Sequence, residues 1–116
     1  MALTKEMVRE KMKDKNTVVL NVLPRGDYDK MHIKGSHSLP WDKDPARLAT
    51  VVEGRYGRDK FFITHCSGYS CQLGPDAAKA LKAAGFKADD YPGGIQEWSE
   101  AGFPIEGSQV KIPTHK

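Results

Sequence analysis

The segment from residue 61 to residue 74, FFITHCSGYSCQLG, decides the fold of this 116-residue chain. Residues 61–64 are an uninterrupted run of apolar and β-branched side chains, which is typical of a strand buried on both faces inside a parallel sheet. Residues 66–72 are small or polar and indicate a loop. From Leu73, apolar side chains recur on one helical stripe as far as Gly85. The segment therefore predicts a strand, a loop and a helix in succession.

The same alternation extends in both directions from this segment. Towards the N-terminus we expect a helix over 4–13 capped by Thr4, a strand over 17–22, one helical turn near 27–31 and a short strand over 36–39. A helix opened by Asp44 and Pro45 then runs to Gly57. Towards the C-terminus we expect a strand over 86–91 and a last helix that stops at Gly102. Alternating strands and helices predict an α/β fold, with a central parallel sheet flanked by helices on both faces.

The composition indicates the class of protein and the cellular compartment that we expect. With 39% hydrophobic and 28% charged residues, the chain is an ordinary globular one, and we expect a single domain over 1–108 with a loosely held tail over 109–116. No apolar stretch is long enough for a membrane span, no signal peptide is evident, and two cysteines are too few for a disulfide framework. A net charge of +3 with mixed signs argues against nucleic-acid binding. We therefore expect a cytoplasmic protein without nucleic-acid or membrane partners.

Cys66 follows the central predicted strand and precedes a helix. Ligands bind beyond the carboxyl ends of the strands in open parallel sheets. The free N–H groups of the loop and the positive end of the helix dipole favour a thiolate there. The alternative is that Cys66 is a small buried apolar residue. Its position at the strand-to-helix turn favours the nucleophile.

Three stretches in the right order carry a family resemblance: residues 20–36 (LNVLPRGDYDKMHIKGS), the cysteine loop, and residues 93–98 (GGIQEW) followed by 101–104 (AGFP). Together they cover about residues 17–107, and in them the sequence resembles a single-domain rhodanese, a sulfurtransferase. The resemblance implies a Cys66 persulfide formed from thiosulfate, a persulfide or a polysulfide and passed to cyanide, a small thiol or a protein thiol, without metal or cofactor. It implies an anion-binding loop formed by Ser67, Gly68, Tyr69, Ser70, Cys71 and Gln72.

The chain departs from the family pattern in ways that bear on the donor. Asn21 stands where the family usually has Asp, and Leu23 where it usually has Arg. The family's loop also commonly carries an Arg near position 71, whereas residues 66–72 contain no Lys or Arg. These departures predict weak affinity for dianionic thiosulfate and favour a persulfide or polysulfide donor.

Cys71 has two interpretations. It is either a resolving thiol that closes a disulfide with Cys66, or a small residue packed at the first helical turn. The first makes a thiol redox or persulfide-reducing protein the main alternative function, and a non-catalytic partner-binding module is the other. Gln72 in place of a phosphatase Arg argues against phosphatase activity. A zinc site of Cys66, Cys71, His65 and one of His32 or His37 is disfavoured because the spacing matches no common zinc site.

Five further side chains are weighed, and a structural role is expected for most of them. His32 is interpreted as hydrogen-bonded scaffold, and Ile95 and Trp98 as core. Strand alternation directs the His65 side chain away from the pocket. His65 could instead tune the thiolate, and the alternative to that role is an exposed side chain. Trp41 is expected to be partly exposed.

Overall fold

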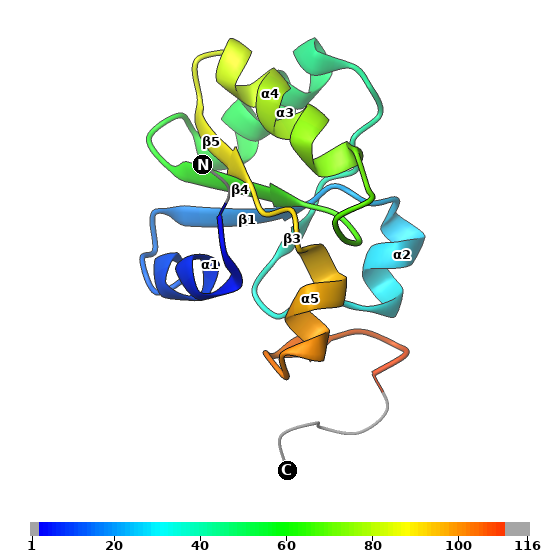
Figure 1. Ribbon diagram of the computed structural model, residues 1–116. Coiled ribbons are helices and arrows are strands. Elements are labelled where there is room, and N and C mark those ends of the chain that lie inside the picture. The colour runs from blue at the N-terminus through cyan, green and yellow to red at the C-terminus, as the bar shows by residue number, and fades with distance from the viewer. Residues whose placement is uncertain (1–2, 111–116) are drawn as a thin grey trace.

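The computed structural model describes residues 3–110 and places a four-stranded parallel sheet at the centre of the chain (Figure 1). The strand order is β3-β1-β4-β5, where β1 is Thr17–Asn21, β3 His37–Ser38, β4 Phe61–His65 and β5 Lys87–Asp90. Every neighbouring pair in this sheet is parallel. The predicted α/β fold and its parallel sheet are therefore confirmed.

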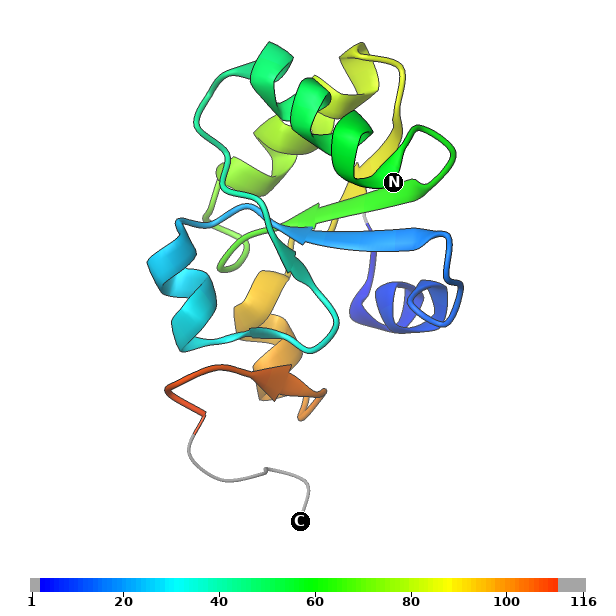
Figure 2. The same ribbon diagram turned by 180° about the vertical axis from the view of Figure 1, so that it is seen from behind.

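Helices cover both faces of the sheet (Figures 1 and 2). Helices α3 (Pro45–Tyr56) and α4 (Leu73–Ala83) lie on one face, and α1 (Lys5–Lys11) and α5 (Gly94–Glu100) on the other. On the first face Leu20 and Phe62 pack in a cluster with residues of α3 and α4. On the second, Val19 and Ile63 pack in a cluster with residues of α1 and α5. Neighbouring residues of β1 and β4 thus face two different cores, which explains their uninterrupted apolar runs.

The predicted helix starts are confirmed in detail. The Thr4 hydroxyl accepts the N–H of Met7 at 3.1 Å, and the Asp44 carboxylate accepts the N–H of Arg47 at 3.1 Å. Pro45 occupies the first turn of α3, where its missing N–H removes no helical bond.

A second, two-stranded sheet has no counterpart in the sequence-based prediction. Strand β2 (His32–Ile33) follows the short helix α2 (Arg25–Lys30) in the chain. It pairs antiparallel with β6 (Ile105–Glu106). Two residues per strand carry no periodicity that a sequence pattern could reveal. This pairing places the C-terminal segment beside α2, and the N–H of Gln109 donates to the carbonyl of Lys30 at 2.9 Å. Residues 111–116 of the predicted tail lie outside the described residues.

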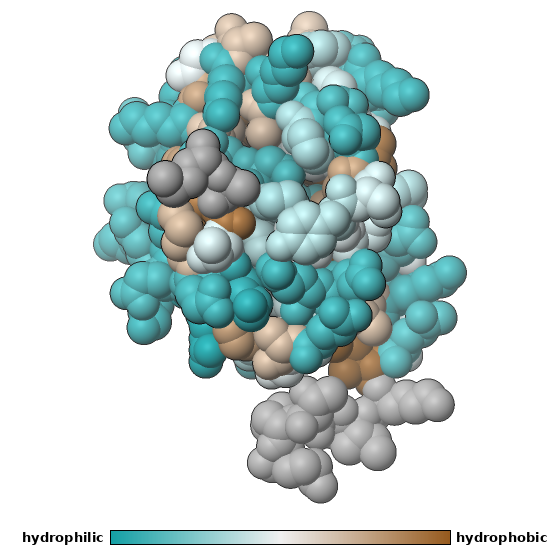
Figure 3. All heavy atoms as spheres, viewed as in Figure 1, coloured by the Kyte–Doolittle hydropathy of each residue, from teal (hydrophilic) through white to brown (hydrophobic). Residues whose placement is uncertain are grey.

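The visible surface is largely hydrophilic, with small and separated apolar patches (Figure 3). Among residues 3–110, no helix has the length and apolar character that crossing a bilayer requires.

We predict that Leu81→Ala lowers the free energy of unfolding by about 2–5 kcal/mol. Leu81 is fully buried between α4 and the sheet, and its removal leaves a cavity. Lys79→Ala, on the exposed side of the same helix, serves as the control and is expected to change stability by less than about 0.5 kcal/mol. Urea unfolding measures both, and equal effects would contradict the assignment of this core.

Candidate active site

The loop of residues 66–72 leaves β4 at the carboxyl edge of the sheet and enters α4. Cys66 is buried, with 3% of its surface exposed, and its Sγ accepts the backbone N–H of Gly74 at 3.3 Å. Gly74 lies in the first turn of α4, where backbone N–H groups have no partner within the helix. The sulfur of Cys66 therefore lies at the positive end of a helix dipole, where a negative charge on sulfur is stabilised.

Helix α5 holds the other side of this loop. The N–H of Ile95 donates to the Cys66 carbonyl at 3.1 Å, and the N–H of Gln96 to the Ser67 carbonyl at 2.8 Å. Gly94 permits this approach, since its φ is +60° and a Cβ there would lie 2.5 Å from the Cys66 carbonyl oxygen. With these two carbonyls turned to α5, the start of the loop is fixed against the helix.

A carboxylate fastens the tip of the loop to the same helix. Glu97 accepts the hydroxyl of Tyr69 at 2.9 Å through one oxygen and the hydroxyl of Tyr91 at 2.7 Å through the other. Tyr69 is otherwise 70% exposed, while Tyr91 is buried. Both phenols have their pKa raised: for Tyr69 the hydrogen bond to Glu97 is the main cause, and for Tyr91 burial is. Both therefore stay protonated and keep donating to the carboxylate.

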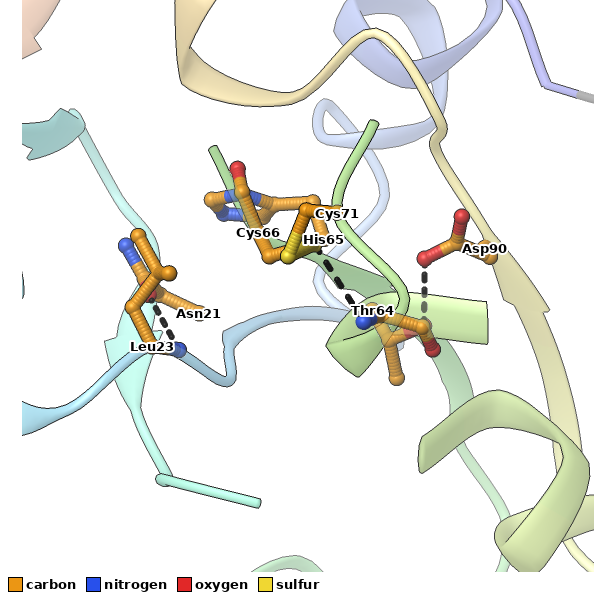
Figure 4. Close-up of a disulfide and its surroundings, with 8 residues drawn as sticks. Asn21, Leu23, Thr64, His65, Cys66, Cys71 and Asp90 are labelled. Carbon is orange, nitrogen blue, oxygen red and sulfur yellow. Dashed lines mark hydrogen bonds between the residues drawn. A yellow bond between two sulfur atoms is a disulfide. The ribbon is translucent and has the colours of Figure 1, made fainter. Parts of the chain in front are cut away.

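Cys66 and Cys71 are joined by a disulfide (Figure 4). Their Cα atoms are 6.3 Å apart, within the usual range for a disulfide. The N–H of Cys71 donates to the Gly68 carbonyl at 3.0 Å, and this turn brings the second cysteine back towards the first. Because the Cys71 amide is used within the loop, it is not free for the anion cradle predicted over Ser67–Gln72. The bond is consistent with the interpretation of Cys71 as a resolving thiol, and Cys71 also packs against the apolar cluster that contains Cys66.

His65 and Asn21 are paired positions of β4 and β1, and both are fully buried. The side-chain oxygen Oδ1 of Asn21 accepts the backbone N–H of Leu23 at 3.0 Å (Figure 4). Among the described residues, neither the Asn21 amide nitrogen nor His65 Nε2 has a hydrogen-bond partner. Burial lowers the pKa of His65 to about 4, so the imidazole is neutral at pH 7. The alternative of an exposed His65 is therefore wrong, because its side chain is fully buried. Strand alternation puts it on the same face of β4 as Ile63, which packs with residues of α1 and α5, whereas Cys66 packs in the core under α3 and α4.

A half-buried carboxyl group, that of Asp90, lies behind the first turn of α4. The Thr64 hydroxyl is 2.8 Å from the Gly74 carbonyl oxygen. It is also 3.0 Å from a carboxyl oxygen of Asp90 (Figure 4). One hydroxyl proton cannot serve two acceptors, so the full set of bonds needs a protonated Asp90 that donates to Thr64. Burial raises the pKa of Asp90 to about 6, so the protonated arrangement forms below about pH 6, and above it the Thr64 hydroxyl can donate to the ionised carboxylate. A Cβ on Gly74 would overlap the Asp90 carboxyl group, so a side chain at this position requires Asp90 to move.

A cavity of about 470 Å³ opens beside Ser67, between α2 and α5. Its lining includes one acidic and one basic side chain, Asp27 and Lys30, together with the neutral polar Gln96 and Ser99. The cavity wall therefore combines both charges with neutral hydrogen-bonding groups.

The remaining residues singled out in the sequence are structural. His32 stacks on Tyr28, with ring centroids 3.9 Å apart, and its Nδ1 lies 2.8 Å from the Tyr28 carbonyl oxygen, as a scaffold histidine would. Ile95 and Trp98 are buried, as predicted, and Trp41 is partly exposed. Within the part of the chain that the structure describes, no three His, Cys, Asp or Glu side chains gather as a metal site requires.

A family model for the rhodanese-like domain matches residues 4–101. The chain belongs to the rhodanese-like domain family. Among curated proteins it is similar to the HTH-type transcriptional regulator Rv0324 of Mycobacterium tuberculosis, at 27% identity over 110 residues, or 94% of this chain and 46% of that protein. The chain thus spans a little under half the length of this relative.

Solved structures show the same fold. The BH2092 protein of Bacillus halodurans has a TM-score of 0.82 at 24% identity, covering 93% of this chain and 77% of that one. The rhodanese-like domain of the Anabaena Alr3790 protein has a TM-score of 0.78 at 20% identity, covering 97% and 83%. EanB, in a cysteine-persulfide state with ergothioneine, has a TM-score of 0.76 at 18% identity, covering 92% and 28%.

Two contributors to this rhodanese-like site were not predicted individually. Gly74 lies two residues beyond the predicted loop of Ser67–Gln72, yet its amide is the one in contact with the Cys66 sulfur. A glycine followed by Pro75 in the first helical turn was the available signal. Asp90 comes from β5, more than twenty residues away, and no local pattern connects it to the loop.

We predict that Gly94→Ala destabilises this rhodanese-like domain by at least about 1–2 kcal/mol, since an L-residue is strained at this positive φ and its Cβ collides with the loop. Gly54→Ala is the matched control. Gly54 lies inside α3, and a methyl group on its Cα would have nothing within 4 Å, so we expect a gain of about 0.5–1 kcal/mol. Urea unfolding of both variants gives the comparison, and a stable Gly94→Ala protein would show that α5 does not hold the loop this closely.

We predict that Asp90 contributes a fall in stability as pH rises. A carboxyl group whose folded pKa is raised from 3.8 to about 6 stabilises the fold below its unfolded pKa, and this contribution is lost as pH rises through about 6. His65 acts in the opposite direction: its contribution is present above 6.5 and is lost as pH falls towards 4. Subtracting the unfolding free energies of the wild type and Asp90→Asn at each pH cancels the His65 contribution. The difference should change sharply between pH 4 and 6, and a flat difference would contradict the prediction.

Proposed function

We propose that this rhodanese-like domain is a sulfurtransferase that carries a sulfane sulfur as a persulfide on Cys66. The family supports a sulfurtransferase-type or related function. The observation that carries the proposal for this chain is the contact between the Gly74 N–H and Cys66 Sγ at the start of α4. A cysteine held there favours the thiolate, which is the attacking form of the group.

The transfer takes two displacements. The Cys66 thiolate attacks the sulfane sulfur of the donor; a bond forms between that sulfur and Cys66 Sγ, and the donor's bond to it breaks as the donor leaves as a thiolate. An acceptor thiolate then attacks the outer sulfur of the persulfide and takes it, which returns the electron pair to Cys66. We propose that backbone amides stabilise the negative charge of the terminal sulfur, namely those of Ser67, Gly68, Tyr69, Ser70, Gln72 and Gly74.

The charges around the loop favour a donor that carries little charge. Residues 66–72 contain no Lys or Arg, and the adjacent cavity combines Lys30 with Asp27. Backbone amides must then stabilise most of the charge, which suits the single charge of a persulfide better than the two of thiosulfate. We therefore propose a persulfide or polysulfide as the donor and a thiol as the acceptor. The cysteine persulfide of EanB supports the proposal in that the same fold accommodates such a species there.

Two variants with one thiol each test the proposal: Cys71→Ser retains Cys66, and Cys66→Ser retains Cys71. Each is reduced, mixed with a polysulfide or with thiosulfate under anaerobic conditions, and followed by intact mass. We expect Cys71→Ser to gain one reducible sulfur atom, faster from the polysulfide than from thiosulfate, and Cys66→Ser to gain none. Sulfur on neither variant would overturn the proposal and leave a non-catalytic, partner-binding module as the better interpretation.

A further inference from the structure

The transfer of sulfur to an outside acceptor leaves one feature of the loop without a role. Cys71 takes no part in either displacement, yet the turn from Gly68 brings it close enough to bond with Cys66. A persulfide on Cys66 would therefore form next to a second thiol already positioned to reach its inner sulfur.

This disulfide adds little as a structural link. The entropic stabilisation by a disulfide grows with the length of the closed loop, and here the two cysteines are only five residues apart. The same segment is already fixed by the Gly68–Cys71 hydrogen bond and by the amides of Ile95 and Gln96. A chemical role explains a bond at this position better than a stabilising one.

The two sulfurs also differ in their surroundings. Cys66 is buried and receives the Gly74 N–H, whereas Cys71 is partly exposed near the outer end of the loop. A reductant from solution therefore reaches Cys71 more easily. Cleavage by attack on Cys71 expels Cys66 as the thiolate, which is the better leaving group because the start of α4 stabilises its charge.

We propose that Cys71 is a resolving thiol that discharges the Cys66 persulfide as sulfide, so that the domain reduces sulfane sulfur at the expense of a dithiol reductant. The inference rests on the persulfide of the proposed function. The Cys71 thiolate attacks Cys66 Sγ, the Cys66–Cys71 bond forms, and the bond between Cys66 Sγ and the sulfane sulfur breaks. Hydrosulfide leaves with the electron pair, so the two cysteines are oxidised by two electrons and the sulfane sulfur is reduced by two.

A dithiol then restores the site. One of its thiolates attacks the sulfur of Cys71 and releases the Cys66 thiolate. Its second thiol attacks the mixed disulfide, which frees Cys71 and leaves the reductant as an intramolecular disulfide. The net reaction consumes one sulfane sulfur and one dithiol, and yields one sulfide and one oxidised reductant.

The test measures sulfide released by the reduced full chain after a single loading with polysulfide and rapid removal of the excess donor, with no reductant added. At about 10 µM protein, we expect the wild type to release one sulfide per loaded site and to end as the Cys66–Cys71 disulfide. In Cys71→Ser the persulfide should persist, with release about a hundredfold slower, because a tethered thiol has an effective concentration of about 1 mM. The wild-type rate should not depend on protein concentration, as an intramolecular attack requires.

A second variant, Cys71→Ala, checks that the result does not depend on the serine hydroxyl. Equal sulfide release from the wild type and both Cys71 variants would overturn the resolving role, as would a stable persulfide on the wild type, and either outcome would leave the sulfurtransferase proposal intact. If no protein that retains Cys66 takes up sulfur, both proposals fail together. Oxidised wild-type protein treated with dithiothreitol should recover its capacity for loading, and failure to recover would contradict the restoring step.

Discussion

Two hydrogen bonds from the first turn of α5 determine how the rest of the site is arranged. The N–H groups of Ile95 and Gln96 bind the carbonyls of Cys66 and Ser67, and Gly94 allows the helix to come close enough. This contact joins the end of β4 to a helix more than twenty residues further along the chain. It also provides acceptors for N–H groups that a helix start would otherwise leave unpaired. The catalytic candidate is therefore fixed by main-chain atoms, which explains how the site can dispense with charged side chains in its loop.

The environment of Cys66 follows from that constraint. With the start of the loop fixed by α5, the sulfur lies at the start of α4 and meets the Gly74 amide. Asp90 occupies the space behind Gly74, where burial keeps its pKa near 6. An ionised carboxylate at that point would lie close to the same helix turn that stabilises the thiolate. Protonation of Asp90 below about pH 6 would therefore complete the hydrogen bonds of Thr64 and remove this unfavourable charge, whereas at pH 7 the carboxyl group is mostly ionised.

The sequence predicts the sheet and its helices because β1 and β4 are buried on both faces, and such strands appear as apolar runs without alternation. The position of Cys66 could be predicted for the same reason: a cysteine directly after such a strand must lie at the carboxyl edge of the sheet. The contacts with Asp90 and α5 could not, since they depend on distances between segments that are far apart in the chain. The disulfide is an intermediate case. Both cysteines are evident in the sequence, but a separation of five residues fits either an open or a closed loop until the turn from Gly68 is known.

This loop departs from the common rhodanese pattern in two ways: it has no Arg near position 71, and it has a second cysteine there. Both departures concern the residue at position 71. A guanidinium near this position would hold an anionic donor by charge-assisted hydrogen bonds, and its absence weakens that binding. A thiol at position 71 instead offers a nucleophile to whatever sulfur arrives on Cys66. The same substitution thus reduces the selection for a dianionic donor and opens an internal route by which the sulfur can leave. If Cys66 carries a persulfide as proposed, a loop built in this way is better suited to removing sulfane sulfur than to storing it, because the Cys71 thiol would lie within reach of the Cys66 sulfur.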